Sequence, residues 1–244
     1  MGLRNELIQF GQIVIGSKFF ISGLALRLVL IFLAIPVTGL AWFVPFLQNA
    51  LIFESINPWS AHLAVGGDPL AFPYGIVMYV ALLPLVSFDY LLQSVGLVKD
   101  SGTIALGLTL FVYDLAMLFI LHLLQPKHPN RLLVLYWLSP VVLYICYWHG
   151  QVDIVPMLLL MLAILFTKRY QPILAGLAMG AAISAKLSML IAPPFLLMYL
   201  ISTKSLRHMI VPALSTTVAT TLVLLTPVLM SDDGWAMIVQ NPEL

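Results

Sequence analysis

Residues 103–124 read TIALGLTLFVYDLAMLFILHLL, and this stretch decides the fold class. The hydrocarbon core of a bilayer is ~30 Å thick and takes ~20 predominantly apolar residues in an α-helix. The stretch meets that length and holds one acidic residue, Asp114. The sequence therefore predicts an all-α fold, a polytopic transmembrane helical bundle of about seven spans. The other expected spans lie at about 19–43, 131–148, 152–167, 172–187, 188–203 and 209–230.

The composition of the whole chain supports this class. Its 244 residues are 61% hydrophobic and only 9% charged, too few charges to cover the surface of a soluble domain. Long unbroken apolar runs favour helices over the alternating strands of a barrel. The net charge of +1 gives no sign of a nucleic-acid partner. The single cysteine, Cys146, cannot form an intrachain disulfide and leaves the redox compartment open.

The distribution of charge predicts an orientation. If residues 73–97 do not cross the membrane, one side holds Arg4, Lys18, Lys127, Arg131, Lys168, Arg169, Lys204 and Arg207. The other side then holds most of the acidic residues: Glu54, Asp68, Asp89, Asp100, Asp153, Asp232, Asp233 and Glu243. The positive-inside rule makes the basic side cytoplasmic. If 73–97 does cross, the later basic pairs fall outside and the pattern is lost.

We therefore expect residues 1–244 to form a single transmembrane domain. Residues 44–102 form its first extracytoplasmic loop in this interpretation, with re-entrant or interfacial helices.

Two charged residues lie deep inside predicted spans. At 1.5 Å per residue, Arg27 and Asp114 are about 12 and 15 Å from the cytoplasmic ends of their spans. An unpaired charge at such a depth costs ~2.5–3.5 kcal/mol on insertion scales. Because the two spans are sequential and antiparallel, we predict a structural ion pair between Arg27 and Asp114. A proton or ion relay is the alternative, although one pair makes no pathway across a bilayer.

The turn at residues 147–153 gathers polar side chains on the expected extracytoplasmic face. An interfacial turn accounts for Trp148 as an anchor, Gly150 as the turn residue and Asp153 as a helix cap. It does not account for His149 and Gln151, which predict binding of hydroxyl groups or phosphate at this face.

Lys186 and the loop acids Glu54 and Asp68 are further candidates on the same face. Gly176 and Gly180 have the spacing of close helix packing, and Lys186 follows them at the expected outer end of that helix. Lysines are rare on this side, so Lys186 suits an anionic partner such as phosphate, with snorkelling to the interface as the alternative. The loop acids Glu54 and Asp68 lie among aromatic residues and prolines, which indicates an ordered loop.

Several of these motifs together resemble a known superfamily. In chain order they are Phe72-Pro73-Tyr74-Gly75, Tyr113-Asp114-Leu115, Ser139-Pro140, Trp148-His149-Gly150-Gln151-Val152-Asp153, and the helix from Leu174 to Lys186. This order resembles the GT-C superfamily of integral membrane glycosyltransferases. It is closest to the mannosyl- and glucosyltransferases that use polyprenyl-phosphate sugars, and the resemblance covers roughly residues 20–205.

The resemblance implies an inverting hexosyltransferase that uses a lipid-linked sugar, a polyprenyl-phosphate-hexose, as donor. Its acceptor would be a glycolipid or a protein, reached on the periplasmic or luminal face of a bacterial inner membrane or the ER membrane. Membrane lipids are then its other partners, and no essential divalent metal is expected. A lipid donor also agrees with the lack of a Gly-rich nucleotide-binding loop.

The resemblance also implies roles for individual residues. The family places its catalytic acid in the first external loop, where the first acids of this chain are Glu54 and Asp68, so these are the predicted bases. Lys186 and His149 are predicted to meet the phosphate, and Gln151 and Asp153 to position the sugar or acceptor.

The sequence leaves other interpretations open. The family usually has more spans and often a C-terminal domain, so the chain would be the N-terminal part of a longer enzyme or a small variant. A multi-span transporter or flippase of a polar or lipid-linked substrate would agree with the span broken at Pro193-Pro194, although the polar residues gather on one face. A non-catalytic membrane assembly partner would tolerate replacement of each polar candidate.

Overall fold

The computed structural model describes residues 3–52, 57–97 and 102–241. Within these ranges the chain is helical and has no β-strand, so the predicted all-α fold is confirmed. The α-helices are α1 (Leu3–Ile15), α2 (Lys18–Leu33), α3 (Val44–Ile52), α4 (Pro58–Ala64), α5 (Ile76–Ser94), α6 (Gly102–Leu124), α7 (Pro129–Leu132), α8 (Pro140–Leu143), α9 (Ile154–Lys168), α10 (Pro172–Ala185), α11 (Ala192–Ser202), α12 (Ile210–Leu229) and α13 (Asp232–Ile238). Three π-helical segments are η1 (Gly39–Phe43), η2 (Leu133–Trp137) and η3 (Tyr144–His149), and two 3₁₀ segments are η4 (Leu187–Ile191) and η5 (Lys204–Met209).

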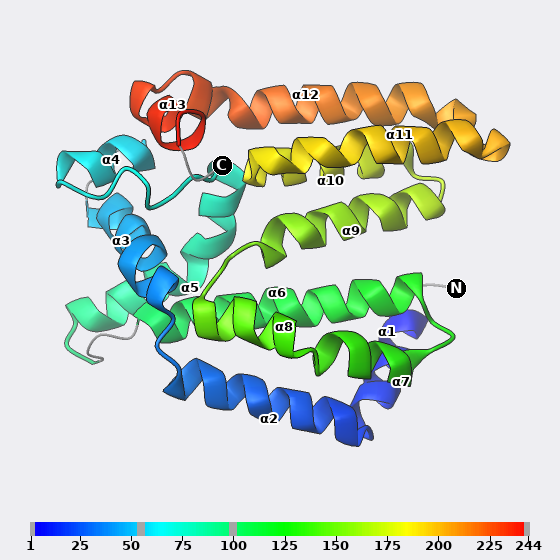
Figure 1. The fold of residues 1–244 in the computed structure, drawn as a ribbon, viewed down its shortest axis with the longest axis horizontal. Helices are drawn as coiled ribbons and strands as arrows, with labels where there is room; N and C mark the ends of the chain where they lie inside the picture. The colour runs from blue at the N-terminus through cyan, green and yellow to red at the C-terminus, as the bar shows by residue number, and fades with distance from the viewer. Residues whose placement is uncertain (1–2, 53–56, 98–101, 242–244) are drawn as a thin grey trace.

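Most of the longer helices run alongside one another between two ends of the molecule (Figure 1). At one end, called here the loop end, lie α3, α4, part of α5 and α13. At the opposite end, called the basic end, lie α1 and the connections 125–128, 169–171 and 203–209. The chain reverses direction at each connection, which brings basic residues far apart in sequence to one end: Lys18, Lys127, Arg131, Lys168, Arg169, Lys204 and Arg207.

Several helices in the described part of the chain have the length and apolarity of membrane spans. These are α5, α6 and the run Lys204–Leu229, and two bent helix pairs raise the number to five if each pair is one span. Three shorter apolar helices accompany them: Ile154–Lys168, Pro172–Ala185 and Leu187–Ser202. The arrangement agrees with a polytopic bundle, while the expected number of spans stays a prediction.

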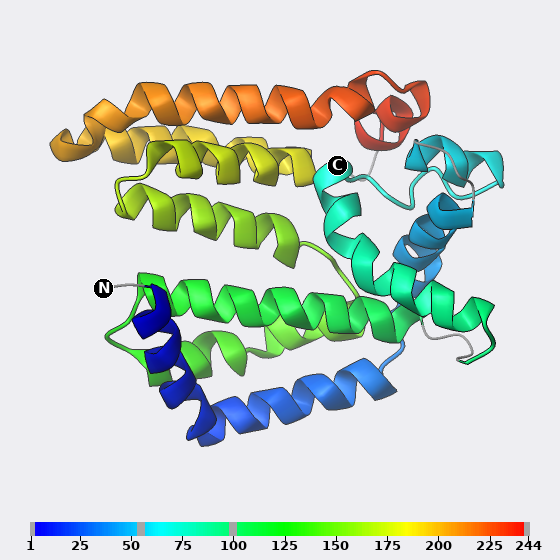
Figure 2. The same ribbon diagram turned by 180° about the vertical axis from the view of Figure 1, so that it is seen from behind.

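The segment between the first two expected spans differs from the other apolar runs. Although α5 is long and apolar enough to cross a bilayer, it runs obliquely across the loop end (Figure 2). Helices α3 and α4 lie at the same end. The assignment of residues 44–102 as an extracytoplasmic loop is compatible with this placement and stays a prediction.

Two spans that were expected to be continuous are interrupted at prolines. The run expected at 19–43 ends as a helix at Leu33, because Pro36 lacks a donor and disfavours helical geometry in the residue before it. The run expected at 131–148 bends by 44° between Trp137 and Pro140. There Ser139 caps the second half by accepting from Val142 N.

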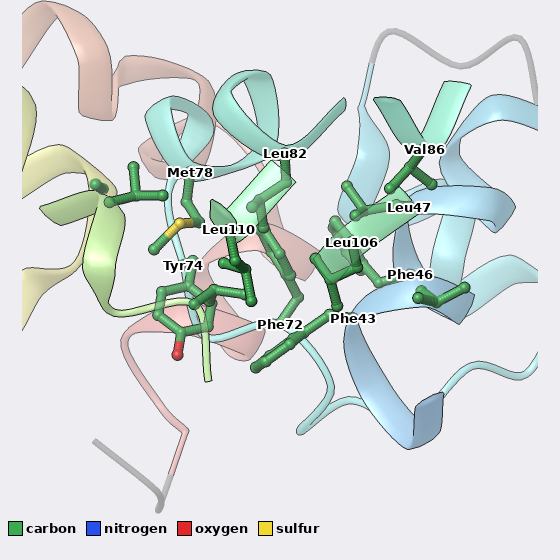
Figure 3. Packing of buried hydrophobic residues seen from close by; sticks show 14 of the residues in the cluster. Phe43, Phe46, Leu47, Phe72, Tyr74, Met78, Leu82, Val86, Leu106 and Leu110 are labelled. Carbon is green, nitrogen blue, oxygen red and sulfur yellow. The ribbon is translucent and has the colours of Figure 1, made fainter. Parts of the chain in front are cut away.

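A buried aromatic cluster fastens the loop end to the bundle. Phe46 of α3 stacks on Phe72 with ring centroids 4.1 Å apart, and Phe43 and Tyr74 meet Phe72 edge-on. Figure 3 shows these rings against side chains of α5 and α6, among them Leu106. Burial of large aromatic side chains is the main favourable term available to hold a short loop in one place.

The other strong packing lies between α10 and α12. A Cβ added to Gly176 would lie 2.5 Å from the carbonyl oxygen of Ala213, and one added to Gly180 would lie 2.7 Å from Thr220 Cβ. Only glycine allows this approach, so the close helix packing expected from the Gly-xxx-Gly spacing is confirmed. The packing fixes α10, whose last residues reach the loop end.

Candidate active site

Two helix ends bring an acid and a base together at the loop end. Lys186 follows the last residue of α10, and Asp153 precedes the first residue of α9. The Lys186 ammonium lies 2.7 Å from Asp153 Oδ1 and 2.9 Å from Oδ2. The side chains are 22% and 38% exposed respectively, so the pair is open to a ligand. The expected role of Asp153 as a side-chain helix cap is wrong, because its carboxylate turns to Lys186 instead.

Tyr74 completes this group from the loop. Its hydroxyl donates to Asp153 Oδ1 at 3.3 Å, and the Lys186 ammonium lies 5.4 Å from the centre of its ring. Tyr74 sits at the edge of the aromatic cluster with its hydroxyl turned away from it (Figure 3). Burial, and then the neighbouring Asp153 carboxylate, raise the pKa of Tyr74 well above 10.0, so the hydroxyl stays a donor.

The backbone of residue 75 explains how Tyr74 reaches that position. Gly75 N donates to the carbonyl oxygen of Ala185 at 3.2 Å, which docks the loop on the end of α10. A Cβ at Gly75 would lie 1.9 Å from the carbonyl oxygen of Ser184, so no other residue fits without displacing backbone. Sequence reasoning missed Tyr74 as a site residue, although the Phe72–Gly75 motif that carries it was visible.

The turn before α9 is held by the segment that follows α2. Gly150 adopts a φ of +82° and lies against Pro36 and Gly39, which follow α2. His149 is exposed, and its Nδ1 lies 3.0 Å from the Thr38 hydroxyl. In the tautomer in which Thr38 donates to Nδ1, the other ring nitrogen carries a proton that it can give to a ligand.

Gln151 follows this turn as a half-buried residue. Its backbone nitrogen donates to the carbonyl oxygen of Ile145 at 2.9 Å and so closes the end of η3. The structure thus joins Asp153 and Lys186 directly and places His149 and Gln151 in the turn that leads to them.

Arg27 and Asp114 meet inside the bundle, as their depths had indicated. Arg27 Nε lies 2.6 Å from Asp114 Oδ2, and both side chains are fully buried. Two tyrosines that sequence reasoning did not assign also donate to this carboxylate, Tyr136 to Oδ1 at 2.6 Å and Tyr147 to Oδ2 at 2.7 Å. Asp114 therefore links α2, α6, η2 and η3.

The guanidinium of Arg27 has further partners. Its Nη1 donates to the carbonyl oxygen of Trp137 at 2.6 Å and to that of Gly23 at 3.1 Å. Its Cζ lies 3.5 Å from the centre of the Trp137 ring, a cation–π geometry. The ion pair, the carbonyl acceptors and the Trp137 ring hold the charge inside one compact group, while Nη2 of Arg27 is buried without a hydrogen-bond partner among the described residues. The contacts support a structural role.

Asp68, one of the two predicted bases, lies apart from the group of Tyr74, Asp153 and Lys186. Asp68 is exposed, and its Oδ1 accepts from Leu70 N at 2.8 Å, which shapes the turn after α4. Its carbonyl oxygen lies 3.1 Å from Nε2 of buried His62, whose Nδ1 lies 3.1 Å from Asn49 Nδ2. Among the described residues, the structure gives Asp68 no contact with Asp153 or Lys186. Glu54, the other predicted base, lies outside the described residues.

Sequence reasoning also missed the polar contacts between the α4 and α13 segments. Ser60 Oγ donates to Asp233 Oδ2 at 2.5 Å, and Asn57 Nδ2 donates to Ser231 Oγ at 2.6 Å. These bonds tie the loop to the segment after α12, so they are structural contacts of the loop end. Within the described residues, no three His, Cys, Asp or Glu side chains are grouped to hold a metal ion.

Comparison with known proteins adds one finding to this geometry. The family model described as glycosyltransferase family 87 matches residues 72–242. The chain belongs to glycosyltransferase family 87. No curated protein and no solved structure matches the chain. With its apolar helices, family membership makes the chain an integral membrane glycosyltransferase and confirms the expected kinship with enzymes of this kind.

The matched range bears on the candidate residues. It contains Tyr74 and the four predicted binding residues His149, Gln151, Asp153 and Lys186. It begins after the two predicted bases, Glu54 and Asp68. Membership favours the glycosyltransferase prediction over the transporter and assembly-partner alternatives.

Proposed function

We propose that this glycosyltransferase transfers a hexose, mannose or glucose, from a polyprenyl-phosphate donor to a lipid-linked or protein acceptor. The reaction takes place at the loop end, which faces the periplasm or the lumen in this proposal. The observation that carries it is the group of Tyr74, Asp153 and Lys186, which presents a partly exposed ammonium at the end of an apolar bundle. A lipid donor can place its phosphate there while its chain stays in the bilayer.

Lys186 has the position and charge to meet the phosphate leaving group. As the bond between sugar and phosphate breaks, negative charge grows on the phosphate, and a preplaced cation stabilises it. Asp153 holds the ammonium in place through both carboxylate oxygens, so little reorganisation is needed at that moment. His149, exposed in the neighbouring turn, is a second donor for the same group.

The acceptor side of the reaction needs a base. A carboxylate must take the proton of the acceptor hydroxyl as that oxygen attacks the anomeric carbon, and inversion follows from a single displacement. Asp68 or Glu54 takes this role in the proposal. Gln151 and Asp153 then position the sugar or the acceptor.

The proposal is tested by sugar transfer from radiolabelled polyprenyl-phosphate mannose and glucose in membranes that contain the protein. Lys186→Gln should lower turnover by about 10²-fold or more, the usual weight of one donor to a developing charge. Lys204→Gln is the matched control, because Lys204 is an exposed lysine at the basic end. Equal transfer in the wild-type protein and Lys186→Gln would contradict the assignment of Lys186.

The same assay separates the two bases. Glu54→Ala and Asp68→Ala are measured singly and together, with insertion checked by protein amount in the membrane. Loss of transfer in one single variant identifies the base, while normal transfer in the double variant shows that the base lies elsewhere.

A further inference from the structure

A groove of about 470 Å³ runs between α9 and α11 on the side of the bundle. Leu160 and Ile164 of α9 form one wall, Phe195 and Leu196 of α11 form the other, and Met179 of α10 lies between them. Its volume falls within the ~300–1,000 Å³ of ordinary ligand pockets. The Phe195 side chain is 66% exposed, so the wall from α11 faces outward as well as into the groove.

The groove has a direction. Helices α9 and α11 both run from the loop end towards the basic end (Figure 1). Lys168 and Tyr199 therefore line the groove near the basic end, and Leu160 and Ala192 line it about two turns earlier. Apolar walls thus lead to an ammonium and a phenol, the residue types that lie at the level of lipid headgroups.

Charge at the mouth of the groove selects the kind of occupant. Lys168 is exposed beside Arg169, and within the described residues the carboxylate of Glu6 pairs with Arg169, at 2.8 and 2.9 Å. The charge of Arg169 is therefore compensated, and that of Lys168 suits an external anion. In a bilayer, an apolar groove open to the side of the bundle faces hydrocarbon chains.

We propose that this groove is a binding site for an anionic phospholipid, with one acyl chain between α9 and α11 and the phosphate at Lys168. A neutral phospholipid fills the groove but brings no net charge to Lys168. The site lies at the end opposite the Tyr74 group and is independent of the proposed reaction.

The test is photocrosslinking in bilayers of phosphatidylcholine that contain a small share of a lipid with a diazirine in its acyl chain. The probe is either phosphatidylglycerol or phosphatidylcholine, and mass spectrometry locates the label. Phosphatidylglycerol should label α9 and α11 more strongly than phosphatidylcholine does. Lys168→Gln should reduce that labelling about fivefold, the weight of one lysine near an anionic surface.

Two variants and a competitor make the result decisive. Lys204→Gln removes a charge from the same end without touching the groove and should leave the labelling unchanged. Ala192→Phe fills the groove and should abolish labelling by both probes, with folding checked by gel filtration. Equal labelling by the two probes, or equal effects of Lys168→Gln and Lys204→Gln, would overturn the proposal. Displacement of the label by polyprenyl phosphate but not by unlabelled phosphatidylglycerol would also overturn it.

Discussion

Replacement of Asp114 by asparagine should unfold the bundle more readily than any other single change at this depth. The carboxylate accepts Tyr136 on Oδ1, and Arg27 together with Tyr147 on Oδ2. An amide has one oxygen and one NH₂ group, so Asp114→Asn must turn its NH₂ to Tyr136, whose hydroxyl can accept, because the opposite orientation sets the NH₂ against Arg27, which can only donate. It also leaves the Arg27 guanidinium charged and fully buried without its counterion.

The size of the effect on stability follows from the loss of the ion pair and of hydrogen bonds to the carboxylate. Removal of one partner from a buried ion pair costs about 3–5 kcal/mol, because an uncompensated charge remains. Side-chain hydrogen bonds inside membrane proteins average only ~0.6 kcal/mol. The ion pair therefore dominates, and Tyr136→Phe and Tyr147→Phe should each lower the free energy of unfolding by well under half as much as Asp114→Asn.

The measurement is the free energy of unfolding in mixed micelles, followed by circular dichroism as denaturing detergent is added. The double variant Arg27→Met with Asp114→Leu removes both charges and should be more stable than Asp114→Asn alone, since apolar replacement of a buried pair is often neutral. A double variant as unstable as the sum of its single variants would refute the pairing argument. So would an Asp114→Asn protein with wild-type stability.

Three further predictions concern the loop end and its position relative to the basic end. Gly75→Ala should detach the loop from Ser184 and so displace Tyr74. In the transfer assay it should lower sugar transfer about as much as Tyr74→Phe does. Burial lowers the pKa of His62 below its ordinary 6.5, so the unfolded loop binds the proton more tightly. The stability contributed by neutral His62 is present above pH 6.5 and is lost as the pH falls. Limited proteolysis should therefore cut the loop faster at pH 5 than at pH 7 in the wild-type protein but not in His62→Phe. Finally, Asp232→Cys and Ser205→Cys should react with an impermeant thiol reagent from opposite sides of the membrane. Both residues are exposed, Asp232 in α13 at the loop end and Ser205 in η5 at the basic end, so labelling from the same side would contradict the orientation.

Features that depend on distance along a helix could be predicted from the sequence. Apolar runs of the right length predicted the helices, and similar depths in neighbouring spans predicted the contact of Arg27 with Asp114. The spacing of Gly176 and Gly180 predicted close packing of α10. Each of these inferences needs only the rise per residue and the chemistry of one face.

Features that depend on the path of the loop could not be predicted. Tyr74 reaches Asp153 because residues 72–75 dock on the end of α10, and no periodicity in the sequence encodes that contact. The same lack of information left Asp153 assigned as a cap, since a free Asp before a helix usually serves as one. Tyrosines in apolar runs usually suggest interfacial anchors, so the donors to Asp114 were not recognised.

The pairing of Lys186 with Asp153 also bears on how a substrate arrives. One ammonium and one carboxylate cancel, and Tyr74 keeps its proton, so these three residues present no net charge to the surrounding water. A group without net charge exerts little long-range attraction of its own on an anionic donor. For the proposed donor, the search is then two-dimensional: the lipid reaches the site by lateral diffusion in its leaflet, and its surface density sets the encounter rate.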